Sequence, residues 1–147
     1  MIRCSNQSLK ELDAFYQTYP IRKGIWASVI SLSEEVQQQL QQLPFPMMEF
    51  TYQTPIPIRN LYRTPQTLGV DRLAAVIAAY TAKPHSPALV IDAGTCITYD
   101  FIDEHGQYQG GNISPGMEMR FKALHEFTSK LPKVEASGET PSYGYST

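Results

Sequence analysis

The sequence predicts an α/β protein, because segments with the apolar spacing of helices alternate with short apolar segments rich in β-branched residues. The strongest strand signal is the apolar run that starts at residue 89, which is interrupted by Asp92-Ala93-Gly94-Thr95 and then resumes as far as residue 101. This pattern predicts a β-hairpin with a polar turn. Helical patterns before and after the hairpin occupy residues 8–16, 33–43, 68–82 and 117–130.

The first helix is predicted over residues 8–16, where Ser8 is the N-cap and Glu11 completes a capping box. Residues 24–30 are short, apolar and partly β-branched, and they predict a buried strand. Residues 47–52 predict another strand.

The second helix is predicted to begin after Ser33, which is a favourable N-cap. Glu34 and Glu35 follow it and place negative charge at the helix N-terminus, where the helix dipole favours it. The glutamine-rich body of this helix, residues 37–42, predicts a neutral face in contact with solvent.

The central part of the chain is predicted to be an extended connection followed by an alanine-rich helix. Prolines within residues 55–65 disfavour helix, since a residue before proline avoids the α region. The helix over residues 68–82 ends at the proline-containing segment 83–87. After the hairpin, we expect Gly110-Gly111 and Pro115-Gly116 to bracket a tight loop before the last helix.

Composition excludes some functions. The formal net charge is −2, so the chain lacks the basic footprint of a nucleic-acid-binding protein. No run approaches the roughly 18 apolar residues of a membrane span, so we expect no membrane partner. The two cysteines, Cys4 and Cys96, fit a reducing compartment better than a disulfide framework, and we expect a cytoplasmic protein. Cys96 is predicted to be a small core residue.

The hairpin turn has residues suited to phosphate. Gly94 allows the backbone to approach a ligand, and Thr95 adds a hydroxyl donor beside amides that can bind an anion. Asp92, at the end of a hairpin strand that we expect to be buried, is placed to hold a cation that accompanies phosphate. The alternative interpretation is an ordinary hairpin with a glycine turn and a solvated aspartate.

Three blocks of sequence carry a further signal. The first contains Gly69-Val70-Asp71-Arg72, and the second contains Asp92-Ala93-Gly94-Thr95. The third contains Gly110-Gly111-Asn112-Ile113-Ser114-Pro115-Gly116. In this order, the three blocks closely resemble the type III pantothenate kinase family, which opens coenzyme A biosynthesis in many bacteria. The resemblance runs from about Ser5 to the C-terminus and is densest between Tyr62 and Pro132.

The resemblance implies an actin-like ATPase (ribonuclease H-like) fold, in which two related α/β domains close around a nucleotide. Residues 1–84 would be the C-terminal portion of the first domain, and residues 85–147 the N-terminal portion of the second. The family begins with a phosphate loop, Asp-x-Gly-Asn-Thr, that nothing before Ser5 matches. We therefore expect a fragment, a start assigned at the wrong methionine, or a decayed homologue.

The resemblance also implies a substrate-side block. Asp71 falls on the catalytic base of the family, and a carboxylate at a helix N-terminus is chemically suited to accept a hydroxyl proton. Arg72 is expected to be an anion partner. Tyr62, the segment Gly69-Val70 and Thr147 fall on substrate contacts. The alternative for Asp71 is an acid that only stabilises the helix dipole.

On the nucleotide side, the resemblance assigns phosphate contact to Thr95 and a monovalent cation, potassium or ammonium, to Asp92. It implies ATP with magnesium as cofactor, pantothenate as substrate and a homodimer. The predicted function is phosphorylation of pantothenate to 4'-phosphopantothenate, with Asp71 as general base. The alternatives are an inactive or partner-dependent kinase fragment, and a transcriptional regulator like the Bvg accessory factor.

Overall fold

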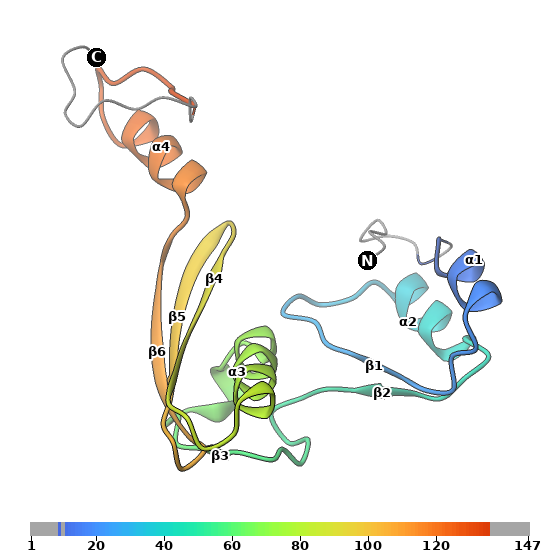
Figure 1. Ribbon diagram of the computed structural model, residues 1–147. Coiled ribbons are helices and arrows are strands. Elements are labelled where there is room, and N and C mark those ends of the chain that lie inside the picture. The colour runs from blue at the N-terminus through green and yellow to red at the C-terminus, as the bar shows by residue number, and fades with distance from the viewer. Residues whose placement is uncertain (1–8, 10, 136–147) are drawn as a thin grey trace. The chain divides into compact units, whose positions relative to one another are not determined.

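The computed structural model describes residue 9 and residues 11–135. These residues form an α/β structure that divides into two compact units (Figure 1). The first unit contains the described residues up to 56 together with residues 64–74. The second unit contains residues 57–63 and the described residues from 75 onward.

The first unit contains a two-stranded parallel sheet. Strands β1 (Gly24–Trp26) and β2 (Met47–Glu49) pair in register from Gly24 with Met47 to Trp26 with Glu49. A parallel pair needs a crossover connection, and helix α2 (Glu34–Gln41) supplies it. Helix α1 (Glu11–Thr18) precedes β1, and the short 3-10 helix η1 (Pro65–Thr67) belongs to the same unit.

The predicted start of α2 is confirmed. The Ser33 side chain accepts a hydrogen bond from the backbone N–H of Val36 at 3.4 Å, and Glu34 and Glu35 occupy the first turn. Val36 itself is buried. The first helix is confirmed in kind, but its predicted N-cap, Ser8, lies outside the described residues.

The buried strand predicted over residues 24–30 is wrong in length and in burial. Pairing with β2 ends at Trp26, and Ile25 is exposed. Beyond the pairing, the Ser28 side chain accepts from the N–H of Ile30 at 3.2 Å. Such local side-chain bonds compete with a strand ladder and favour a turn.

The second unit contains a four-stranded mixed sheet with the order β3-β6-β5-β4. Neighbours β4–β5 and β5–β6 are antiparallel, whereas β3 is parallel to β6. The strands are β3 (Arg59–Asn60), β4 (Ala88–Ala93), β5 (Cys96–Ile102) and β6 (Gln107–Pro115). Helix α4 (Met117–Glu126) follows β6, and helix α3 (Val70–Ala82) contributes residues to both units.

The core of the second unit lies around one end of strands β5 and β6. Ile102, Tyr108 and Val76 are fully buried there, and Ile58 is almost fully buried. Gly106 closes the β5–β6 turn with a φ of +72°, which favours glycine.

The loop predicted between Gly110 and Gly116 is wrong, because most of this segment belongs to β6. Gly110 pairs with Phe101 and Gly111 pairs with Asp100 across the sheet. Consecutive glycines favour a turn when only their own segment is considered, whereas here they lie inside a strand. Glycine within a strand often marks a place where other groups approach the backbone closely.

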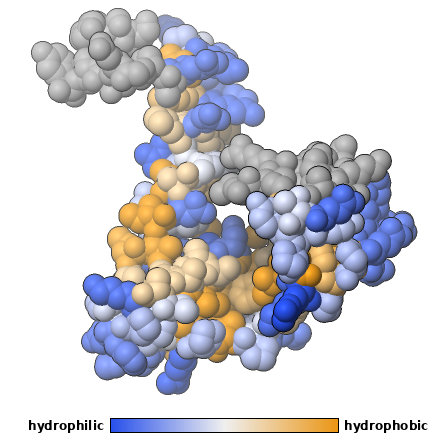
Figure 2. All heavy atoms as spheres, turned by 45° about the vertical axis from the view of Figure 1, so that its right-hand side comes forward, coloured by the Kyte–Doolittle hydropathy of each residue, from blue (hydrophilic) through white to orange (hydrophobic). Residues whose placement is uncertain are grey.

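The prediction of a buried hairpin strand is also wrong. Leu89 and Ile91 of β4 are exposed, as is Phe101, the cross-strand partner of Leu89. Cys96, predicted to be a core residue, is an exposed free thiol. Alternate residues of a strand face opposite sides of the sheet, so an apolar run buries both sides only when both are covered. Apolar side chains are visible at the molecular surface in Figure 2.

Candidate functional site

The segment Gly69-Val70-Asp71-Arg72 begins helix α3. The carbonyl oxygen of Gly69 accepts the N–H of Leu73 at 3.2 Å, and the Oδ1 of Asp71 accepts the N–H of Arg72 at 2.8 Å. A Cβ atom at position 69 would lie 2.5 Å from that Oδ1. A side chain at position 69 would therefore collide with the Asp71 carboxylate, and glycine avoids this collision.

The first turn of α3 holds one exposed and one buried charged residue. Asp71 is exposed, whereas Arg72 is 7% exposed, and Val70 is half-buried. Arg72 is therefore not a surface side chain. An exposed carboxylate at a helix N-terminus is accessible to a hydroxyl group and sits where the helix dipole favours negative charge.

The hairpin predicted from Asp92-Ala93-Gly94-Thr95 is confirmed. Strands β4 and β5 pair from Ala88 with Ile102 to Ala93 with Ile97, which leaves Gly94 and Thr95 in the turn. Asp92, Gly94 and Thr95 are exposed. A Cβ atom added to Gly94 would lie 3.9 Å from the carbonyl oxygen of Cys96, its nearest neighbour. The space beside this glycine is therefore open.

The hairpin turn packs directly against the start of α4. The N–H of Gly116, the N-cap residue, donates to the carbonyl oxygen of Thr95 at 2.9 Å. A Cβ on Gly116 would lie 2.2 Å from the carbonyl oxygen of Gly94, so glycine is required for this approach. Arg120 adds a bond from Nε to the carbonyl oxygen of Pro115 at 2.8 Å. The backbone of Thr95 thus lies beside the N-terminus of α4, and the hydroxyl of an exposed residue beside a helix N-terminus is a combination that suits an anion.

Asp92 is the predicted cation ligand. Among the residues that the structure describes, no three His, Cys, Asp or Glu side chains are grouped as a metal cage. A single exposed carboxylate fits a hard cation that takes its other oxygen ligands from phosphate and water. Asp92 is therefore compatible with a cation that arrives with a phosphate ligand.

Tyr62 lies in the second unit, whereas Gly69–Arg72 lie in the first. Its N–H donates to Oδ1 of Asn60 at 2.9 Å, and its ring stacks on that of Tyr108, with centroids 6.3 Å apart and planes 9° apart. The remaining predicted substrate contact, Thr147, lies outside the described residues. The structure thus brings Gly69, Asp71 and Arg72 together, and separately Asp92 and Thr95.

Sequence reasoning missed a buried polar pair. The hydroxyl of Tyr108 donates to Oδ1 of Asp100 at 2.5 Å, and both residues are almost completely buried. A signal was available, because Asp100 interrupts the β-branched and aromatic run of β5 between Tyr99 and Phe101. A charged residue inside such a run is buried only when a partner satisfies it.

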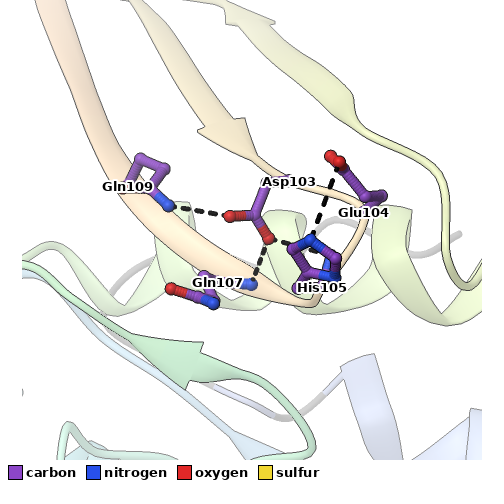
Figure 3. Close-up of polar contacts among 5 residues, drawn as sticks. All are labelled: Asp103, Glu104, His105, Gln107 and Gln109. Atoms are coloured by element: carbon purple, nitrogen blue, oxygen red, sulfur yellow. Dashed lines mark hydrogen bonds and ion pairs between the residues drawn. The ribbon is translucent and has the colours of Figure 1, made fainter.

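The turn between β5 and β6 has its own polar network (Figure 3). The Asp103 carboxylate accepts the N–H of Gln107 at 2.8 Å, the side-chain amide of Gln109 at 2.8 Å and the N–H of His105 at 3.0 Å. The bond from the Gln107 amide, reinforced by Gln109 and His105, lowers the pKa of Asp103, although desolvation acts in the opposite direction. This network fixes the turn and has no evident part in the candidate site.

Comparison with known proteins identifies the family of this α/β chain. The family model of type III pantothenate kinase matches residues 4–147. The type III pantothenate kinase of Phocaeicola vulgatus is 60% identical over 147 residues, which are 100% of this chain and 61% of that protein. That of Bacteroides fragilis is 56% identical over 97% of this chain and 59% of its own length. The chain belongs to the type III pantothenate kinase family.

The chain spans about 60% of the length of these two relatives. A solved structure of a Baf family protein from Campylobacter jejuni is also similar. It has a TM-score of 0.49 and 24% identity, and the match covers 90% of this chain and 58% of that one. Within the described part of the chain, no helix is long and apolar enough to span a membrane.

Proposed function

We propose that this chain acts as a type III pantothenate kinase, which transfers the γ-phosphoryl group of ATP to pantothenate and yields 4'-phosphopantothenate. The observation that carries the proposal is the family match over residues 4–147, with 60% identity to a relative along the whole chain. The proposal includes the actin-like ATPase fold, with residues 1–84 and 85–147 belonging to its two domains.

Asp71 is proposed as the general base. Its carboxylate is exposed in the first turn of α3, and one of its oxygens is held by the N–H of Arg72. A base held in this way is suited to orient the primary hydroxyl of pantothenate and accept its proton as the oxygen attacks phosphorus. Tyr62, Gly69, Val70 and Thr147 are the proposed substrate contacts, and Arg72 is proposed to support this block as an anion partner.

Thr95 is proposed to contact the nucleotide phosphates through its hydroxyl, since the residue is exposed in a turn whose backbone bonds to the N-cap residue of α4. Asp92 is proposed to hold the monovalent cation, potassium or ammonium. Bound ATP with magnesium would supply the phosphoryl group and neutralise charge on its oxygens. A homodimer and a cytoplasmic location complete the proposal. The homodimer derives from the family resemblance alone, and the location derives from the composition.

The test is a phosphorylation assay that compares the wild-type chain with Asp71→Asn and Glu34→Gln. Glu34 is the matched control, because it is also an exposed acid in the first turn of a helix of the first unit. Loss of a general base is expected to lower kcat by about 100-fold or more. The Asp71→Asn protein should keep its circular dichroism spectrum, and Glu34→Gln should retain wild-type activity.

An Asp71→Asn protein with undiminished kcat would show that Asp71 only stabilises the helix dipole. A wild-type chain that forms no 4'-phosphopantothenate would contradict the kinase proposal for this chain. An inactive remnant or a regulator would give that second result.

A further inference from the structure

We propose that Tyr108 and Asp100 are positioning residues that fix the ring of Tyr62. The inference rests on the proposed function in one respect, namely that Tyr62 contacts pantothenate. It assigns a task to a buried hydrogen bond that the proposed chemistry does not use.

Tyr62 lies where the backbone alone gives little support. Strand β3 ends at Asn60 after only two residues paired with β6. The last backbone bond to β6 runs from the N–H of Leu61 to the carbonyl oxygen of Tyr108, at 3.0 Å. The N–H of Tyr62 then donates to the Asn60 side chain at 2.9 Å, which turns the chain away from the ladder. The direction of the Tyr62 ring must therefore be set by its side-chain contacts.

The ring of Tyr62 makes two contacts with β6. It lies almost parallel to the ring of Tyr108, with a 9° angle between the planes and 6.3 Å between centroids. It also lies against Gly110, where a Cβ would be 3.4 Å from Cδ2 of Tyr62. Tyr62 is only half-buried, so part of its side chain stays accessible.

Tyr108 is itself held by a hydrogen bond to Asp100. It is 0% exposed, and its hydroxyl donates to Oδ1 of Asp100, which is 1% exposed. The distance of 2.5 Å lies in the short range of hydroxyl-to-carboxylate bonds. A phenylalanine at position 108 would fill nearly the same volume, but it would take a hydrogen-bond donor away from the buried Asp100 carboxylate, and a buried carboxylate is costly unless donors satisfy it. The hydrogen bond between Tyr108 and Asp100 therefore fixes the orientation of the Tyr108 ring, in addition to the packing of the ring in the core.

The two consecutive glycines of β6 make room for this arrangement. A Cβ on Gly111 would lie 2.5 Å from Oδ1 of Asp100 and 1.9 Å from the carbonyl oxygen of Tyr99. Gly110 has a φ of +107° and faces the ring of Tyr62. Glycine weakens the interior of a strand, so two consecutive glycines indicate that another group approaches the backbone closely at each position. One admits the Asp100 carboxylate, and the other admits the ring that Tyr108 supports.

The test compares Tyr108→Phe with Tyr80→Phe in the full chain. Tyr80 is the matched control, since it is a partly buried tyrosine of the second unit that packs on Gly106 and His85. The first measurement is the NMR chemical shift of the Tyr62 ring protons without ligand, assigned with Tyr62→Phe. The second is the Kd for pantothenate, with the Kd for ATP as an internal reference.

The expected result is that Tyr108→Phe moves the Tyr62 ring signals and raises the pantothenate Kd about fivefold, which corresponds to losing one net hydrogen bond. The ATP Kd should stay unchanged, and Tyr80→Phe should change neither quantity. Asp100→Asn keeps an acceptor for the Tyr108 hydroxyl and should give a smaller shift of the same Tyr62 signals. If Tyr108→Phe does not fold, the shift of the Tyr62 ring signals in Asp100→Asn tests the proposal instead.

Unchanged Tyr62 ring signals in Tyr108→Phe, or in Asp100→Asn where that variant decides, would overturn the proposal. Equal rises of the Kd for ATP and for pantothenate would also overturn it, because they would indicate a general loss of structure. A wild-type chain that binds no pantothenate would contradict the proposed function instead. The ligand-free ring signals would then still decide whether Tyr108 and Asp100 position Tyr62.

Discussion

The two ends of strand β5 have opposite environments. At its first end, the residues from Asp92 through the hairpin turn to Cys96 are all exposed. At its other end, Asp100 and Ile102 are buried together with Tyr108 of β6. The exposed end has the Asp-x-Gly-Thr motif proposed to meet phosphate, and the buried end has the polar pair proposed to position Tyr62. Strand β5 thus connects the proposed phosphate contact at one end to the proposed support for Tyr62 at the other.

This difference shows which features depend on neighbouring residues in the sequence and which depend on contacts between strands. A turn motif is read from residue types that adjoin in sequence, because its chemistry depends on local backbone and side chains. A buried pair depends on partners from two strands and on the glycines that admit them. Substitutions at the two ends of β5 and in the adjoining segments can test whether their environments differ in this way.

The largest expected effect is on stability at the buried end. Ile102 is 0% exposed, whereas Ile91 on the neighbouring strand is 56% exposed. Replacing Ile102 with alanine should lower the free energy of unfolding by about 2–5 kcal/mol, since it leaves a cavity in the core. Replacing Ile91 with alanine should change it by less than about 0.5 kcal/mol. Urea unfolding followed by circular dichroism measures both.

Equal losses for the two isoleucine variants would contradict the contrast. That result would mean that the face of β4 carrying Ile91 is covered in solution. The matched pair is informative because the same side chain is removed from neighbouring strands of one sheet.

A smaller effect is expected from Asp103 in the turn beyond the buried end. Its pKa is lowered in the folded protein by the N–H of Gln107, with help from Gln109 and His105. The ordinary value is 3.8, so the ionised carboxylate stabilises the fold above that pH, and the stabilisation disappears as pH falls through the lowered folded value. The stability difference between wild type and Asp103→Asn should therefore be present at neutral pH and vanish in strong acid.

Urea unfolding of both proteins across this pH range measures the difference. A stability gap that is constant with pH would show that the Asp103 charge makes no contribution. An asparagine oxygen can still accept some of the turn's N–H bonds, which is why the expected difference is small.

The α/β class, the helix after Ser33 and the hairpin at Gly94-Thr95 were predictable from sequence, because caps, apolar spacing and turn residues act locally. Burial was not predictable in the same way. Leu89 and Ile91 have the composition of core residues, yet nothing in their own segment determines whether their face of the sheet is covered. Gly110 and Gly111 have turn chemistry in isolation, and only their pairing with β5 makes them part of a strand.

The candidate site shows the same limits. The neighbours Gly69, Asp71 and Arg72 were predicted as one block and do contact one another. The burial of Arg72 could not be derived from its neighbours in sequence. Asp100 was visible as a charged residue within an apolar run, but its partner Tyr108 lies on another strand beyond a turn.

The most direct test of the central claim is to incubate the purified chain with ATP, magnesium, potassium and pantothenate and to detect the product by mass spectrometry. The account predicts 4'-phosphopantothenate in the wild-type reaction, formed in step with ADP and absent without pantothenate. ADP formation that does not depend on pantothenate, or no product at all, would contradict the assignment of pantothenate kinase activity to this chain.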